Sequence, residues 1–196
     1  AIIDWAAVFA RDVLNADVAL RSIPFAVFMV GMIIGRLSMT RMAERWHPHL
    51  IASRGSFLAA LALTLAAIFA PMIADISSSL GLMTASLLWG VAGFGLSSVS
   101  PAFFSAAGHV PGVSTAWAVS RLSLFNSMVS IGAKTVMGAL TEGVGLSMAF
   151  FFPITLAIGS GIIAGMFASR ARQSELNAAA PPTGPISIIV APESDR

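Results

Sequence analysis

Residues 55–74 read GSFLAALALTLAAIFAPMIA, and this stretch decides the fold. It carries no charged side chain, and its length matches the roughly 20 apolar residues that an α-helix needs to cross a bilayer core. Two further stretches, 76–108 and 143–169, are also free of charge and are longer. The sequence therefore predicts an all-α membrane protein.

The composition of the whole chain supports this class. Of 196 residues, 57% are hydrophobic and 10% charged, and the mean hydropathy is +0.87. Soluble domains carry about 25% charged residues, and a soluble fold cannot cover so much apolar surface with so few polar groups. The net charge is +2 without a basic run, so the composition does not favour a nucleic-acid partner.

Three weaker segments complete the predicted bundle. The apolar run 22–35 is too short to span alone and needs flanking residues between 16 and 40. The segment 114–140 spans only if Arg121 and Lys134 face protein or water. Residues 1–13 resemble the end of a truncated span, so we expect the natural protein to begin earlier. These segments predict a bundle of about six transmembrane helices over 1–170, followed by a disordered tail over 171–196.

Charges between the spans predict an orientation. Four arginines lie in the connection 36–54, which falls on the same side of the predicted bundle as the turn 108–112 and the tail. The opposite side holds Asp75 and Glu142. Because short cytoplasmic loops are rich in Lys and Arg, we expect the arginine-rich side and the tail to be cytoplasmic.

Glycines inside the spans predict close helix packing, because a missing side chain lets two backbones approach in lipid. Gly161 and Gly165 form a GxxxG pattern. Such matches are common in glycine-rich apolar segments, so we expect packing within this chain in preference to a dimer face.

No catalytic or metal-binding pattern is present in the sequence. Cysteine is absent, which excludes disulfides, zinc–thiolate sites and cysteine nucleophiles. The chain has no Gly-x-Ser-x-Gly, no phosphate-binding glycine loop with Lys, and no His-Glu-x-x-His. His47 and His49 flank a proline in a polar segment without an acidic cluster, so we predict no metal site, no cofactor and no enzyme.

Three segments carry a family resemblance. Residues 4–14 (DWAAVFARDVL), 35–45 (GRLSMTRMAER) and 101–112 (PAFFSAAGHVPG) resemble parts of the major facilitator superfamily (MFS) of transporters. In the same order, they are similar to the end of helix seven, to the loop motif between helices eight and nine, and to the end of helix ten with its cytoplasmic turn. The chain resembles the C-terminal half, helices seven to twelve, of the bacterial fucose-permease-like and YbjJ-like branch.

The resemblance implies a fold and a function. It implies two inverted three-helix repeats and, as partner, the N-terminal six-helix half of the same carrier. It further implies secondary active transport of a small solute, sugar-like or another polar metabolite, by alternating access in the bacterial inner membrane. The resemblance does not decide between proton symport and efflux of the solute. The implied partners are the solute itself and membrane lipid.

The resemblance also assigns a conformational-switch loop to Gly35, Arg36, Glu44 and Arg45. In the family, charges in this loop stabilise one access state. Met39 and His47 stand where the motif usually has glycine, although the charged pair of Glu44 and Arg45 is retained. Helix eleven of the branch often carries Gly-Pro where Lys134 and its neighbour stand here.

Polar side chains inside the spans are the candidates for substrate binding or proton coupling, because an intramembrane charge costs about 2.5–3.5 kcal/mol on insertion scales. Asp4 is either a proton site or a structural hydrogen-bond partner, and Lys134 either contacts an anionic group or snorkels to the outer headgroups. Asn126 either binds substrate or ties two helices together. Arg121 either lines a cavity or, as we favour, lies at the cytoplasmic interface. Phe28 either lines a sugar-like pocket or, as we favour, packs in the core.

A second function remains open. A non-transporting membrane scaffold or subunit would bind partners through the cytoplasmic loop and tail. An intramembrane enzyme ranks last, because it needs paired carboxylates or a nucleophile with a base, and Asp4 is the one acid expected inside the membrane.

Overall fold

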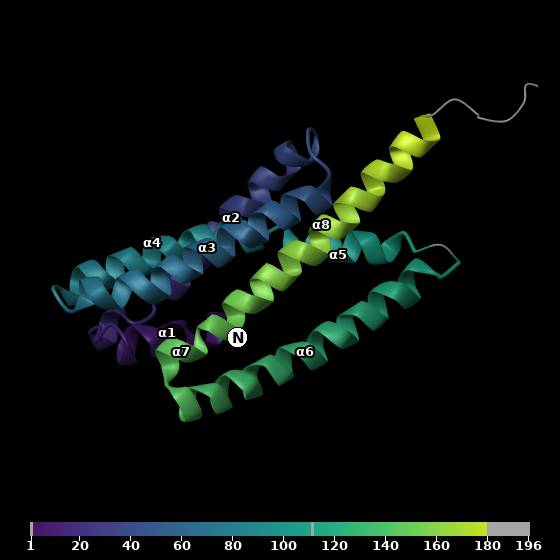
Figure 1. The fold of residues 1–196 in the computed structure, drawn as a ribbon. Helices are drawn as coiled ribbons and strands as arrows, with labels where there is room; N and C mark the ends of the chain where they lie inside the picture. The colour runs from purple at the N-terminus through teal and green to yellow at the C-terminus, as the bar shows by residue number, and fades with distance from the viewer. Residues whose placement is uncertain (1, 111, 180–196) are drawn as a thin grey trace, which may run out of the picture.

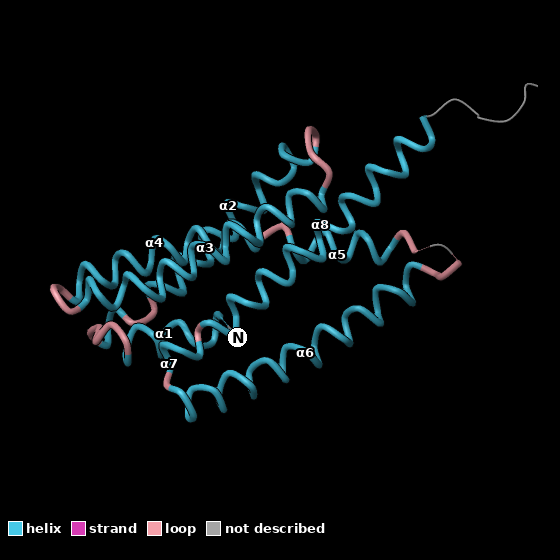
Figure 2. The backbone as a smooth tube through the Cα atoms, viewed as in Figure 1, coloured by secondary structure: helices cyan, strands magenta, loops and turns pink. Residues whose placement is uncertain are grey.

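The computed structural model of the chain describes residues 2–110 and 112–179, which form helices joined by turns (Figures 1 and 2). In chain order the elements are α1 (Ile2–Asp12), η1 (Val18–Leu20), α2 (Ile23–Ala43), α3 (Pro48–Ala74), α4 (Ser78–Leu96), α5 (Val99–Gly108), α6 (Thr115–Val144), α7 (Leu146–Ala149) and α8 (Phe151–Ala179).

Four described stretches are long and apolar enough to cross a membrane: Val18–Met39, Pro48–Ala74, Ser78–Gly108 and Leu146–Gln173. Three of them overlap the three predicted charge-free stretches, and together they confirm the all-α membrane class. The helix α6 is not among the four, because Arg121, Lys134 and many Ser and Thr residues lower its hydropathy.

The bundle is built around α3, which packs against both α4 and α8, while α2 packs against the other side of α4. Glycine makes these approaches possible. A Cβ on Gly31 of α2 would lie 2.0 Å from the carbonyl oxygen of Gly90 in α4, and one on Gly55 of α3 would lie 2.3 Å from that of Gly95. Both distances are far below contact, so these helices meet backbone to backbone.

A cluster of aromatic rings fills the core where α1, α2, α4 and the α7–α8 junction meet. Trp89 is 1% exposed, and its ring centroid lies 6.1 Å from that of Phe9, 5.7 Å from that of Phe150 and 6.5 Å from that of Phe28. Phe9 and Phe150 meet edge to face at 4.7 Å. Aromatic pairs at such distances add about 0.5–1.5 kcal/mol each beyond their buried area.

The GxxxG segment packs within the chain, as predicted. A Cβ on Gly161 would lie 3.2 Å from side-chain atoms of Ser56 and Phe57 in α3, and one on Gly165 would lie 3.1 Å from Ser53 Oγ. The Ser53 hydroxyl donates to the Gly161 carbonyl at 2.7 Å. The small residues of α8 therefore face α3.

The long apolar stretch 76–108 is divided into two helices at Ser97 and Ser98. Pro101 explains the break, because proline has no N–H to bond the carbonyl four residues earlier, which is that of Ser97. The two serine hydroxyls turn back onto the end of α4, donating to the carbonyls of Phe94 at 2.7 Å and Gly95 at 3.4 Å.

The predicted polar connection 36–54 is much shorter in the structure. Helix α2 continues to Ala43 and α3 begins at Pro48, so only residues 44–47 join them. The prediction was wrong because it equated polar with non-helical. Arg, Met, Leu and Ala favour helix, and Pro48 suits a first helical position.

The C-terminal helix also extends further than predicted. α8 continues to Ala179, past the boundary drawn at residue 170, because Ala, Arg, Gln, Glu and Leu dominate its last turns. The rest of the predicted tail, 180–196, lies outside the described residues, and the domain boundary stays a prediction.

Candidate functional site

The candidate site begins with α6, which stands apart from the packed helices (Figure 1). Its contacts are chiefly with α5 and α7, the elements next to it along the chain. At its start the Thr115 hydroxyl donates to the Gly108 carbonyl at 3.0 Å, and Gly145 ends it with φ +84°, which glycine adopts without strain. Between these ends most of its side chains are exposed.

A groove separates the middle of α6 from α4, α5 and α8, and we call it the α6 groove. It consists of two adjoining hollows of about 390 Å³ and 290 Å³. Leu96, Asn126 and Val129 line both hollows. The first hollow is completed by Val99, Ser100, Phe103, Phe104, Leu122 and Phe125, and the second by Ser130, Ala133, Pro153, Leu156, Ala157 and Ser160.

Asn126 is the polar residue shared by both hollows of the α6 groove. Its amide has two donors and an acceptor, and the hydroxyls of Ser100, Ser130 and Ser160 lie in the surrounding walls. The remaining lining is apolar. Mostly apolar walls with a few placed polar groups are typical of small-molecule sites.

The two cations of α6 lie outside the lining of the α6 groove. Arg121 is exposed, and its guanidinium carbon lies 5.1 Å from the centroid of the Trp117 ring.

 The tighter pair for comparison is Arg54 over Trp46, at 4.3 Å. An arginine on a tryptophan near the start of α6 fits the interfacial alternative for Arg121 that we favour. Lys134 is also exposed, while its neighbour Ala133 lines the groove.

Two other predicted site residues lie elsewhere. Phe28 is buried at 2% exposure in the aromatic core beside Trp89, and it lines no hollow found among the described residues. Its place in the core supports the packing alternative over a sugar-like pocket. Asp4 belongs to α1, but its side chain lies outside the described part of the structure.

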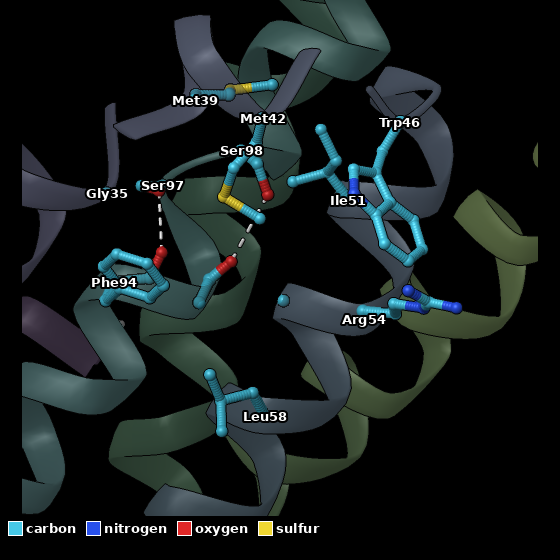
Figure 3. Close-up of a pocket in the computed structure, with 12 residues that line it drawn as sticks. Gly35, Met39, Met42, Trp46, Ile51, Arg54, Leu58, Phe94, Ser97 and Ser98 are labelled. Carbon is cyan, nitrogen blue, oxygen red and sulfur yellow. Dashed lines mark hydrogen bonds between the residues drawn. The ribbon is translucent and has the colours of Figure 1, made fainter. Parts of the chain in front are cut away.

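A separate hollow of about 260 Å³ lies at the turn between α2 and α3, and we call it the turn pocket (Figure 3). Gly35 forms part of its wall, where a Cβ would lie 2.3 Å from Ser97 Oγ. This predicted switch residue is therefore the point at which α2 meets the α4–α5 break. The other lining residues are Met39, Met42, Trp46, Ile51, Arg54, Gly55, Leu58, Phe94, Gly95, Ser97 and Ser98.

The charged members of the predicted switch loop do not line the turn pocket, although Glu44 and Arg45 lie in the turn between α2 and α3. Arg36, Glu44 and Arg45 are exposed, and Glu44 caps the end of α2 through its backbone. Among the described residues, groups of three or more potential metal ligands are not found.

Sequence reasoning missed the turn pocket. Trp46 and Arg54 are eight positions apart and looked like separate features of a loop. They meet because α3 begins two residues after Trp46 and brings Arg54 back over the indole ring. The signal available in the sequence was Pro48 after a polar turn, which marks a helix start.

The helices define an all-α protein with several helices able to span a membrane. Over 149 residues the chain is 26% identical to an uncharacterized MFS-type transporter of Yersinia pestis, and this similarity supports membership of the MFS. The match covers 76% of this chain and 36% of the relative, so the chain spans about a third of that protein's length. No family profile and no solved structure matches the chain.

Proposed function

We propose that this chain is the C-terminal half of an MFS-type secondary transporter of a small solute. Its six spans would be α1, α2, α3, the broken helix α4–α5, α6, and α7–α8. The similarity to an MFS-type transporter supports this proposal, as do the four apolar spans. The two inverted repeats and the fucose-permease-like branch belong to the same proposal.

The observation that carries the proposal is the α6 groove. Within one six-helix half, α6 leaves Asn126 exposed between the two hollows of this open groove. An N-terminal half packed over the mouth of the groove would convert it into an enclosed cavity near the middle of the membrane. A solute with both hydroxyl and apolar surfaces, such as a sugar, suits the amide, the serines and the aliphatic walls.

The arrangement of the turns supports the proposed orientation. The turn at 44–47, the α5–α6 turn and the end of α8 point to one end of the bundle, and the turns around Ser77 and Gly145 point to the other (Figure 2). The first end carries Arg41, Arg45 and the α8 arginines. By the positive-inside rule this end is cytoplasmic, and the protein is a multi-pass protein of the bacterial inner membrane.

The proposed mechanism is alternating access between two halves. The α6 groove would open first to one side of the membrane and then to the other, while the charges at 36–45 would stabilise one of these states. Arg121 and Lys134 would lie at opposite ends of the spanning part of α6, and Asp4 would be a proton-coupling candidate on α1. The gradient of an ion or of the solute itself would supply the energy.

Cysteine accessibility tests this proposal. The chain contains no cysteine, so Asn126→Cys introduces a unique thiol here; any cysteines in the rest of the natural protein are replaced first. In membrane vesicles of both orientations, alternating access predicts that a membrane-impermeant maleimide reaches Cys at 126 from either side. A transported monosaccharide, found by uptake into the same vesicles, should change the two labelling rates in opposite directions.

Thr135→Cys, an exposed site on the same helix outside the groove lining, is the matched control, and its rates should not respond to the monosaccharide. Reaction at position 126 from one side alone, unchanged by any solute, would contradict alternating access and favour the non-transporting scaffold.

A further inference from the structure

The turn pocket lies where two proposed spans meet the membrane surface. One apolar span ends at Met39 and the next begins at Pro48, and Trp46 lies between them. Tryptophan is enriched at the level of the lipid headgroups. The pocket therefore opens at the boundary between hydrocarbon and headgroups, on the end of the bundle that carries the arginines.

The walls of the turn pocket suit a hydrocarbon chain. Met39, Met42 and Leu58 supply flexible apolar surface, and the last two are 39% and 40% exposed at its mouth. Methionine adapts to irregular apolar ligands. The hollow of about 260 Å³ is several times the roughly 30 Å³ that one water occupies in the liquid.

The floor of the turn pocket offers little to a polar solute. The hydroxyls of Ser97 and Ser98 already donate to the carbonyls of Phe94 and Gly95 (Figure 3). Their donors are engaged at the α4–α5 break, so a sugar entering the pocket would lose water without gaining equivalent hydrogen bonds. An apolar occupant incurs no such loss.

One cation, Arg54, belongs to the lining of the turn pocket. The Arg54 guanidinium carbon lies 4.3 Å from the centre of the Trp46 ring, and both residues line the pocket. Outside the lining, exposed Arg41 and Arg45 lie at the end of α2 and in its turn, beside the single acid Glu44. Arginine binds phosphate through two parallel N–H bonds, and it is suited to lipid phosphates at a membrane surface.

We propose that the turn pocket is a binding site for an anionic phospholipid of the arginine-side leaflet. Part of an acyl chain would enter between Met39, Met42 and Leu58, and the headgroup phosphate would bind Arg54. The inference goes beyond transport, because it requires only that the helices lie in a bilayer. Failure of the transport proposal would leave it standing, and the reverse also holds.

Native mass spectrometry of the purified full-length protein, titrated with phosphatidylglycerol or phosphatidylcholine, tests the proposal. We expect phosphatidylglycerol to bind at least about fivefold more tightly, because each basic residue near an anionic lipid contributes about 1 kcal/mol. Arg54→Gln should remove about fivefold of that affinity for phosphatidylglycerol and leave phosphatidylcholine binding nearly unchanged. Met42→Trp, which fills the mouth, should weaken binding of both lipids.

Arg121→Gln is the matched control, because Arg121 also stacks on a tryptophan but lines no comparable pocket. It should retain the phosphatidylglycerol affinity. Unfolding temperatures and size-exclusion profiles close to those of the unmodified protein show that each variant is folded. Equal losses in the two arginine variants would overturn the proposal in favour of general surface charge. Displacement of the lipid by inorganic phosphate alone would overturn it in favour of a free-anion site.

Discussion

At the scale of single residues, glycine determines how closely α2 and α4 approach. The space beside Gly31 is occupied by the Gly90 backbone, whereas nothing lies within 4 Å of a Cβ built on Gly132 in α6. The same substitution should therefore have opposite effects at these two positions.

Gly31→Ala should lower the free energy of unfolding by about 1–3 kcal/mol, because the added methyl group forces two backbones apart. Gly132→Ala should be neutral or stabilising by a few tenths of a kcal/mol up to about 1 kcal/mol, since alanine favours helix. Denaturant unfolding in detergent, followed by circular dichroism, measures both. An unchanged free energy of unfolding in Gly31→Ala would show that α2 and α4 are not in backbone contact.

The aromatic core supplies a second comparison between residues. Trp89→Ala should lower the free energy of unfolding by about 3–5 kcal/mol, because the ring is 1% exposed among Phe9, Phe28 and Phe150. Trp117→Ala removes the same side chain at a position that is 54% exposed, so its effect should be much smaller. A smaller loss for Trp89 than for Trp117 would contradict this core.

At the scale of elements, hydropathy predicted where helices run but not where they break or how they end. Within the charge-free stretch 76–108, Pro101 is the one sequence feature that indicates the division into two helices. The polar segment 36–54 contains the end of α2 and the start of α3, and its polarity did not indicate either boundary. Long-range features were also out of reach. The α6 groove forms because α6 lies away from α8, and the turn pocket forms because Arg54 packs on Trp46. Neither contact can be derived from the periodicity of the local sequence.

The separation of α6 from the bundle can be measured along the helix. Met128 is 73% exposed and Met137 is 1% exposed, so in the detergent-solubilised chain Met128→Cys should react with a maleimide at least about tenfold faster than Met137→Cys. Equal rates at the two positions in the isolated chain would contradict the packing of α6 described above.

At the scale of the whole molecule, the all-α class follows from composition and charge-free length, whereas the number of spans depends on α1 and α6. If both cross the membrane, the turns alternate between its two sides. Ser77→Cys should then react with an impermeant maleimide from the periplasmic side, and Ser114→Cys from the cytoplasmic side. Labelling of both from one side would show that α4–α5 does not span as a unit.

The central claim is that this chain is one half of a larger carrier, and the intact mass of the native protein tests it most directly. Mass spectrometry of the protein extracted from its own membrane should show a species about twice the 20.3 kDa of this chain, because a carrier of this class has two six-helix halves. A native species close to 20.3 kDa would contradict the half-carrier account.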